Sequence, residues 1–178
     1  MMAWTMADYQ RLPWFALRVK SRCEKLVHST LSGKGYSTLL PVYRVKRKWG
    51  GRDFKVELPL FPGYTFAAFD PEKRLPVLTT PGLMHLVGIG KAPYPLDEAE
   101  VDNIRRVVES DLDAQPWPFL QAGQQVEIHD GPLRGVSGLL LQIKRKQQLV
   151  VSVTLLQRAV AVEIQTDWVR PVAGASVR

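Results

Sequence analysis

The chain has 178 residues, 46% apolar and 23% charged, which suits one or two folded domains and excludes disorder throughout. Its 24 Lys and Arg outnumber 17 Asp and Glu, and the formal charge of +7 favours an anionic partner such as nucleic acid. No apolar run reaches the roughly 18 to 20 residues of a membrane span, nothing near the start resembles a signal peptide, and the single cysteine excludes an internal disulfide, so we expect a cytoplasmic protein.

The first elements predict a strand, a helix and a hairpin. After residues 1–13, which we expect to be disordered, Trp14–Val19 alternates as a half-buried strand does. Ser21 and Glu24 have the spacing of a capping box, which predicts that a helix follows. Two β-rich runs then flank Gly50-Gly51, and this dipeptide favours a tight hairpin turn.

Further strands and a second helix complete this domain. Strands are predicted from Tyr64 and over 83–89, and Asp97 precedes a helix with apolar residues at three- and four-residue steps. Hairpin connections in the order β-α-β-β-β-α imply antiparallel pairing. We therefore predict an α+β sandwich over residues 14–110.

The rest of the chain predicts a linker and a small barrel. Residues 111–118 include two prolines that interrupt helix and strand alike, which favours a linker. Five short apolar runs separated by turn residues predict an SH3-like five-stranded β-barrel over 119–172, followed by a tail over 173–178. Because Val150–Leu156 and Val160–Ile164 contain many β-branched residues, we expect a resident barrel rather than a helical hairpin.

Two segments of the chain resemble family motifs. Glu57–Phe66, with the sequence ELPLFPGYTF, is similar to the signature of the NusG N-terminal (NGN) domain. Val126–Gly138, with the sequence VEIHDGPLRGVSG, is similar to a KOW motif. In this order they identify the chain as a member of the NusG family of transcription elongation and antitermination factors. Pro59–Pro71 and Val153–Ile164 resemble specialised paralogues of the RfaH and UpxY kind.

The resemblance implies a binding site for RNA polymerase. Aromatic residues beside the Pro-Gly bend would form an apolar pocket for the coiled coil of the polymerase β′ clamp. The residues implied are Trp14, Phe15, Phe61, Pro62, Tyr64, Phe66, Ile89 and Val101. The alternative is that these side chains are simply core. Thr79 and Thr80 lie near where relatives contact the polymerase β gate loop, although the chain is shorter there and lacks the family's His-Thr-Thr run.

A basic hairpin predicts contact with upstream or non-template DNA. Six basic residues between Arg44 and Lys55 are opposed only by Asp53, and phosphate contacts of this kind give salt-dependent affinity. An exposed Trp49 would stack on a base. The alternative is a solvated hairpin edge that resists aggregation. The candidates are Lys20, Arg22, Lys34, Arg44, Lys46, Arg47, Lys48, Trp49 and Arg52.

By resemblance, the KOW barrel binds a second partner, either a NusE-type ribosomal protein or Rho, and the residues do not decide between them. The expected partner contacts are Leu133, Arg134, Gln157 and Arg158. The three histidines lack the motif context of a catalytic or metal site, so we expect a monomer without catalysis, cofactor or metal. The alternative function is a ribosome-associated RNA-binding KOW protein, although seven basic and four acidic residues give the segment from Phe119 only +3.

Overall fold

The computed structural model describes residues 12–89, 92–118, 123–143 and 146–172, and it has the expected α+β architecture. The disorder predicted for residues 1–13 falls largely, and the tail over 173–178 entirely, outside the described residues. The chain divides into two compact units. The first runs up to Leu40 and resumes over Pro62–Glu98, and the second takes in Pro41–Phe61 and the chain from Ala99 onward. No helix in the described part of the chain is both long and apolar enough to cross a membrane.

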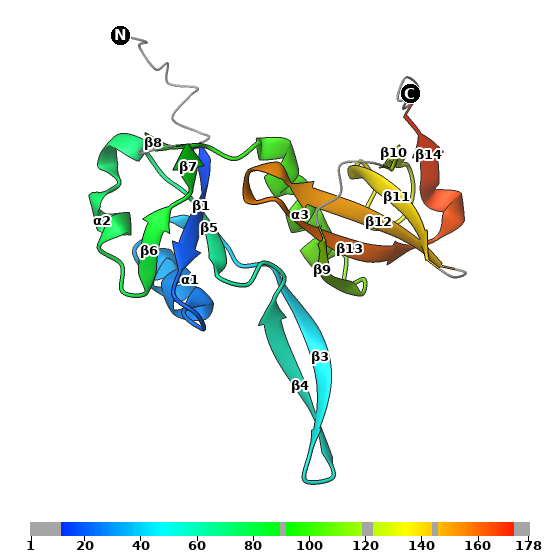
Figure 1. The fold of residues 1–178 in the computed structure, drawn as a ribbon, viewed down its shortest axis with the longest axis horizontal. Coiled ribbons are helices and arrows are strands. Elements are labelled where there is room, and N and C mark those ends of the chain that lie inside the picture. Colours follow the sequence, from blue (N-terminus) through cyan, green and yellow to red (C-terminus); the bar gives the residue numbers. More distant parts are fainter. Residues whose placement is uncertain (1–11, 90–91, 119–122, 144–145, 173–178) are drawn as a thin grey trace. The chain divides into compact units, whose positions relative to one another are not determined.

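The first unit is built on an antiparallel sheet with the strand order β2-β5-β1-β6 (Figure 1). Its strands are β1 (Trp14–Val19), β2 (Ser37–Leu39), β5 (Tyr64–Ala68) and β6 (Leu83–Leu86). Helix α1 (Glu24–Gly33) covers one face, where its Val27 and Leu31 pack with Phe15, Leu17 and Val19 of β1. The odd-numbered residues of β1 point into this core, as the predicted strand requires, but Ala16 on the opposite face is buried as well.

Short elements connect the strands of the first unit. A 3-10 turn (Pro71–Lys73) and helix α2 (Leu75–Leu78) lie between β5 and β6. The strand expected over 83–89 is interrupted after Leu86, and β7 (Gly88–Ile89) pairs instead with β8 (Ala92–Pro93). The Val87 N–H still donates to the Ala16 carbonyl of β1 at 2.9 Å, and the chain leaves this ladder only where Gly88 pairs with Pro93.

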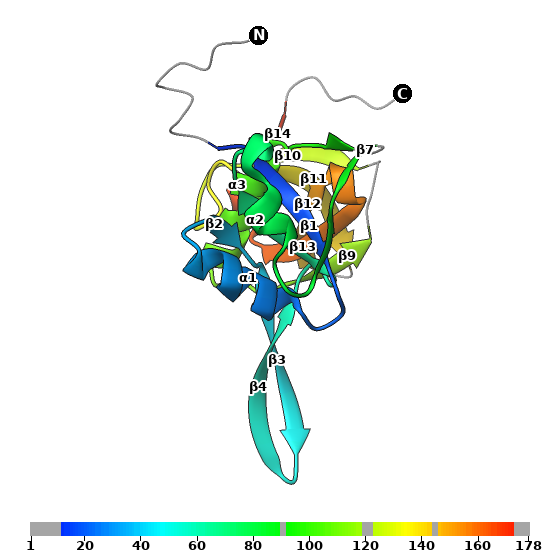
Figure 2. The same cartoon turned by 90° about the vertical axis from the view of Figure 1, so that its left-hand side faces the viewer.

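In the second unit, β3 (Val42–Trp49) and β4 (Arg52–Pro59) form the predicted hairpin. Gly50 and Gly51 both have positive φ, at 56° and 78°, as a two-residue turn of the primed type requires. Figures 1 and 2 show a twisted two-stranded ribbon, and within the described residues β3 and β4 pair only with each other. Helix α3 (Glu98–Glu109) confirms the predicted second helix and buries Val101, Ile104 and Val107.

The barrel domain is a six-stranded sheet within the described residues, with the order β14-β10-β11-β12-β13-β9. Its strands are β9 (Ala114–Pro118), β10 (Gln124–Ile128), β11 (Ser137–Ile143), β12 (Lys146–Val153), β13 (Arg158–Ile164) and β14 (Val169–Pro171). Short 3-10 turns occupy Thr154–Leu156 and Thr166–Trp168. The β-rich runs 150–156 and 160–164 are largely strand, which agrees with the expected resident barrel.

The predicted linker over 111–118 needs correction, because residues 114–118 form the edge strand β9 and pair with β13. Pro116 and Pro118 are two residues apart, so their missing N–H groups face the same side of the strand. The ladder to β13 can use Gln115 and Trp117, and an edge strand is where a sheet tolerates proline. The domain division also differs from the predicted 14–110 and 119–172, because α3 and the hairpin belong to the same compact unit as the barrel.

Candidate functional site

The bend at Pro62-Gly63 is held in place by contacts within the first unit. The Gly63 N–H donates to Oε1 of Glu24 at 2.8 Å, and the Gly63 carbonyl accepts from the Val19 N–H at 2.9 Å. With a φ of 82°, Gly63 adopts a conformation that other residues rarely reach, and a Cβ at this position would clash with the Arg18 guanidinium. The bend therefore needs glycine at 63 and the buried carboxylate of Glu24.

Tyr64 follows this bend and is also fixed by a neighbour. Arg18 and Tyr64 are directly opposite in the β1–β5 ladder, and the Arg18 guanidinium lies 4.8 Å from the centre of the Tyr64 ring. Such a cation–π contact contributes about 0.5–1 kcal/mol at a partly exposed site. The ring is only partly buried, so a fixed aromatic surface is left for a partner.

The eight residues proposed to contact polymerase divide by exposure. Phe15, Phe61, Phe66 and Val101 are buried, whereas Trp14 and Tyr64 are partly exposed, Pro62 is exposed and Ile89 is 67% exposed. Phe15 lies in the α1 core, with its ring 4.7 Å from that of Phe69. Four of the eight side chains are therefore accessible to a partner, and the other four are buried in the described structure.

Tyr94, an exposed aromatic residue that the sequence did not single out, lies near the start of β1. The Tyr94 N–H donates to the Val87 carbonyl at 3.3 Å, and the Leu96 N–H donates to the Trp14 carbonyl at 2.8 Å. These bonds hold the segment after β8 beside Val87 and Trp14, and the Tyr94 side chain in this segment is 50% exposed. Its only signal in the sequence is a tyrosine between Pro93 and Pro95.

Thr79 and Thr80 differ in accessibility. Thr80 is buried, and its hydroxyl accepts from Lys34 Nζ at 3.1 Å and donates to the Pro76 carbonyl at 3.2 Å. Lys34 Nζ also donates to the Pro76 carbonyl at 2.8 Å. Lys34, a predicted nucleic-acid contact, therefore fastens α1 to α2, while Thr79 stays exposed.

The remaining basic candidates are exposed, and most of them lie on the hairpin. Arg44, Lys46, Arg47, Lys48, Trp49 and Arg52 all have exposed side chains, as do Lys20 and Arg22 in the first unit. Arg44 differs from the others because carboxylates surround it. Its Nε lies 3.6 Å from Glu57 Oε1, and its Nη1 lies 3.9 Å from Asp111 Oδ1. Arg44 is therefore less available to a phosphate than its neighbours.

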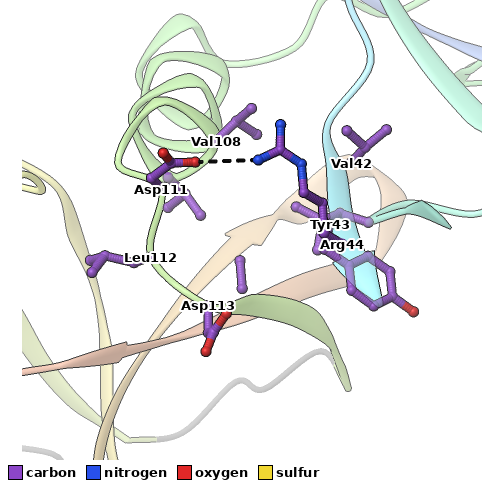
Figure 3. A pocket seen from close by; sticks show the side chains of 10 residues that line it. Val42, Tyr43, Arg44, Val108, Asp111, Leu112 and Asp113 are labelled. Atoms are coloured by element: carbon purple, nitrogen blue, oxygen red, sulfur yellow. Dashed lines mark ion pairs between the residues drawn. The ribbon is translucent and has the colours of Figure 1, made fainter. Parts of the chain in front are cut away.

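The second unit contains a pocket of about 360 Å³ beside Arg44. In Figure 3 the Arg44 guanidinium points across this pocket toward Asp111. The lining residues are Val42, Tyr43, Arg44, Leu60, Val107, Val108, Asp111, Leu112, Asp113 and Ala114.

The proposed partner contacts of the barrel lie in two places. Leu133 is fully buried and belongs to the barrel core, whereas Arg134, Gln157 and Arg158 are exposed. Gln157 has a left-handed φ of 50°, and its Nε2 donates to the Thr154 carbonyl at 2.9 Å. The Arg134 carbonyl accepts from Arg106 of α3 at 2.7 Å. Arg134, Gln157 and Arg158 can therefore still meet a partner.

Helix α3 contacts the barrel through a carboxylate that the sequence analysis did not single out. Glu100 Oε1 accepts from the Thr154 hydroxyl at 2.6 Å and from the Thr154 N–H at 3.1 Å. Asn103 adds a longer bond of 3.5 Å to the Ser137 carbonyl. These contacts explain why the helix belongs to the same compact unit as the barrel.

Comparisons with known proteins agree with the motifs. A family model described as "Transcription termination factor nusG" matches residues 12–105. A protein named "Transcription termination/antitermination protein NusG" from Thermus thermophilus is 30% identical, covering 89% of this chain and 97% of that protein. A protein of the same name from Vibrio cholerae is 30% identical over 71% of this chain and 72% of its own length. The solved structure titled "Domain interaction in Thermotoga maritima NusG" has a TM-score of 0.56 at 20% identity, over 92% of this chain and 98% of that one.

Proposed function

Because this chain belongs to the NusG family and is a transcription elongation and antitermination factor, we propose that it binds RNA polymerase through the corner formed by Pro62, Gly63 and Tyr64. The partner element is the coiled coil of the β′ clamp. A protein that binds the closed clamp better than the open one shifts the population toward the closed state. The expected result is reduced pausing or termination, and no chemistry is required.

The observation that supports this proposal most is the fixed geometry of the corner. Glu24 holds the Gly63 amide and Arg18 lies over the Tyr64 ring, so the exposed aromatic side is ordered before a partner arrives. Trp14, Ile89 and Tyr94 of the same unit offer further accessible apolar surface. Rigid aromatic anchors lose little entropy on binding, which is why they often dominate the energy of an interface.

The test is the affinity of purified polymerase for the full chain and for Tyr64→Ala. We expect the variant to bind at least about tenfold more weakly, as for an interface anchor. Phe54→Ala, which removes an exposed ring from the hairpin, is the matched control and should bind normally. Equal affinity of Tyr64→Ala and the parent protein would disprove the corner as the polymerase site.

Other proposed contacts belong to the same function. Thr79, which is exposed near Leu75 and Leu78 of α2, would meet the polymerase β gate loop. The hairpin would contact upstream or non-template DNA. Arg134, Gln157 and Arg158 would bind a NusE-type ribosomal protein or Rho. We also propose a specialised role of the RfaH and UpxY kind, which an elongation assay on long operons would test.

The alternative function is an RNA-binding protein of the ribosome that uses the KOW barrel. That function requires tight, steeply salt-dependent binding of naked RNA by the barrel. The barrel is only weakly basic, and the exposed aromatic corner would have no partner. A titration of the full chain with ribosomal RNA at two salt concentrations separates the two functions.

A further inference from the structure

The two faces of the β3–β4 hairpin have different chemistry. Directly opposed residues share a face, and the pairs Arg47–Phe54 and Trp49–Arg52 lie on one side with Val45–Val56. We refer to Val45, Arg47, Trp49, Arg52, Phe54 and Val56 as the aromatic face. Arg44–Glu57, Lys46–Lys55 and Lys48–Asp53 make up the other side, which we refer to as the lysine face. Both carboxylates of the paired strands are on the lysine face.

The two rings of the aromatic face are exposed in the described part of the chain. Trp49 is 84% exposed and Phe54 is 50% exposed, although rings of this size usually dominate a core or an interface. Neither strand pairs with a third strand in the described part of the structure. A lone two-stranded hairpin is marginally stable in water, and exposed rings do not add to its stability by packing. Exposed apolar surface of this kind indicates a binding site for a partner.

The charges beside the rings indicate what binds there. Each ring has an arginine directly across the ladder, Arg47 opposite Phe54 and Arg52 opposite Trp49, and no acid lies on this face. Duplex DNA would use the arginines but hide its bases, and an apolar protein surface would use the rings but lack anions for the arginines. Single-stranded nucleic acid supplies both, an unstacked base for each ring and a phosphate for each cation.

We propose that the aromatic face of the hairpin binds single-stranded nucleic acid, with unpaired bases stacked on Trp49 and Phe54 and phosphates held by Arg47 and Arg52. The two rings are diagonal neighbours in the ladder, at a typical spacing of roughly 7–8 Å, so each can carry its own base. This proposal rests on the proposed contact between hairpin and nucleic acid, and it specifies the strandedness of the ligand and the residues that recognise it.

The test is a titration of the full chain with labelled oligonucleotides of about 12 nucleotides, near the site sizes of stacking proteins. The probes are oligo(dT), oligo(U), an abasic strand of the same length, and a duplex. We expect the parent protein to prefer oligo(dT) or oligo(U) over the abasic strand by about tenfold or more, and the comparison of the two distinguishes DNA from RNA. Binding the abasic strand or the duplex as tightly as the single strands would overturn the proposal.

Variants of the two faces test whether the aromatic face is the one that binds single strands. Trp49→Ala with Phe54→Ala should remove the preference for bases and leave abasic binding unchanged. Arg47→Gln with Arg52→Gln should weaken single-strand binding more than Lys46→Gln with Lys55→Gln, which removes the same charge from the lysine face. Equal losses from the two charge variants would contradict the assignment.

Further variants guard against a change in folding. Trp49→Phe keeps a ring and should keep most of the affinity, whereas Trp49→Leu keeps only apolar surface and should lose it. Equal behaviour of these two variants would rule out stacking. No polymerase is present in the titration, so it reports on the hairpin even if Tyr64→Ala shows that the polymerase proposal is wrong.

Discussion

Glu24 has the sequence spacing of a local helix cap, but its side chain bonds to a residue far away in the sequence. Its spacing from Ser21 predicts a capping box, but no side chain caps α1, and the carboxylate of Glu24 accepts from the Gly63 amide instead. A single sequence cannot separate the two roles, because both need a hydrogen-bond acceptor at the same position. The buried carboxylate thus joins the first helix to the bend at Pro62-Gly63.

We predict that Glu24→Ala destabilises the fold by about 1–3 kcal/mol, because it leaves the Gly63 N–H without its acceptor. Urea denaturation measures this free energy of unfolding. Glu24→Gln keeps a carbonyl acceptor and should cost less. A loss below about 0.5 kcal/mol in the alanine variant would show that this bond contributes little.

His28 on α1 gives a prediction about pH. Its Nδ1 is enclosed without a hydrogen-bond partner in the described structure, and burial lowers the pKa of the imidazole below its ordinary value. The unfolded chain therefore takes up the proton more readily, so His28 costs no stability above pH about 6.5 and an increasing amount below it. The melting temperature should fall less between pH 7.5 and pH 5.5 in His28→Leu than in the parent protein. An equal drop would exclude His28 as a source of acid sensitivity.

At the scale of elements, the signals differ in how well they predict structure. Gly50-Gly51 predicted the hairpin correctly because few residues other than glycine reach the φ values of that turn. The prolines of β9 predicted a linker and were misleading, since an edge strand accommodates a residue without an N–H. The break between β6 and β7 goes with the pairing of β7 with β8, which the sequence of residues 83–89 alone does not reveal.

The contact between helix α3 and the turn at residues 154–156 gives a testable prediction. Glu100 accepts two hydrogen bonds from Thr154, so Glu100→Ala should speed amide hydrogen exchange at Thr154 and along the turn 154–156. Glu109→Ala, an exposed position on the same helix, is the control and should leave exchange at Thr154 unchanged. Equal exchange in Glu100→Ala and the parent protein would mean that this contact does not order the turn.

For the whole molecule, the family and the α+β architecture were predictable because two motifs occur in a fixed order along the chain. Which of the proposed site residues are exposed and which are buried could not be predicted from the sequence. Tyr64 and Phe66 are two residues apart in β5 and so lie on the same face of the strand, yet Phe66 is buried and Tyr64 is partly exposed. Burial depends on what packs over a strand, and the strand's own sequence does not contain that information. The same limit hid the fixed position of Lys34 and the core position of Leu133.

Strand β9 has a consequence for how a second protein can bind the barrel. It forms one margin of the sheet, and its two prolines lack donors on the same side, so an incoming extended peptide finds an incomplete row of hydrogen-bonding groups there. The strand at the other margin, β14, is only three residues long and also ends in a proline. Recruitment by adding a strand is thereby disfavoured at both margins, which leaves side-chain recognition at the loops.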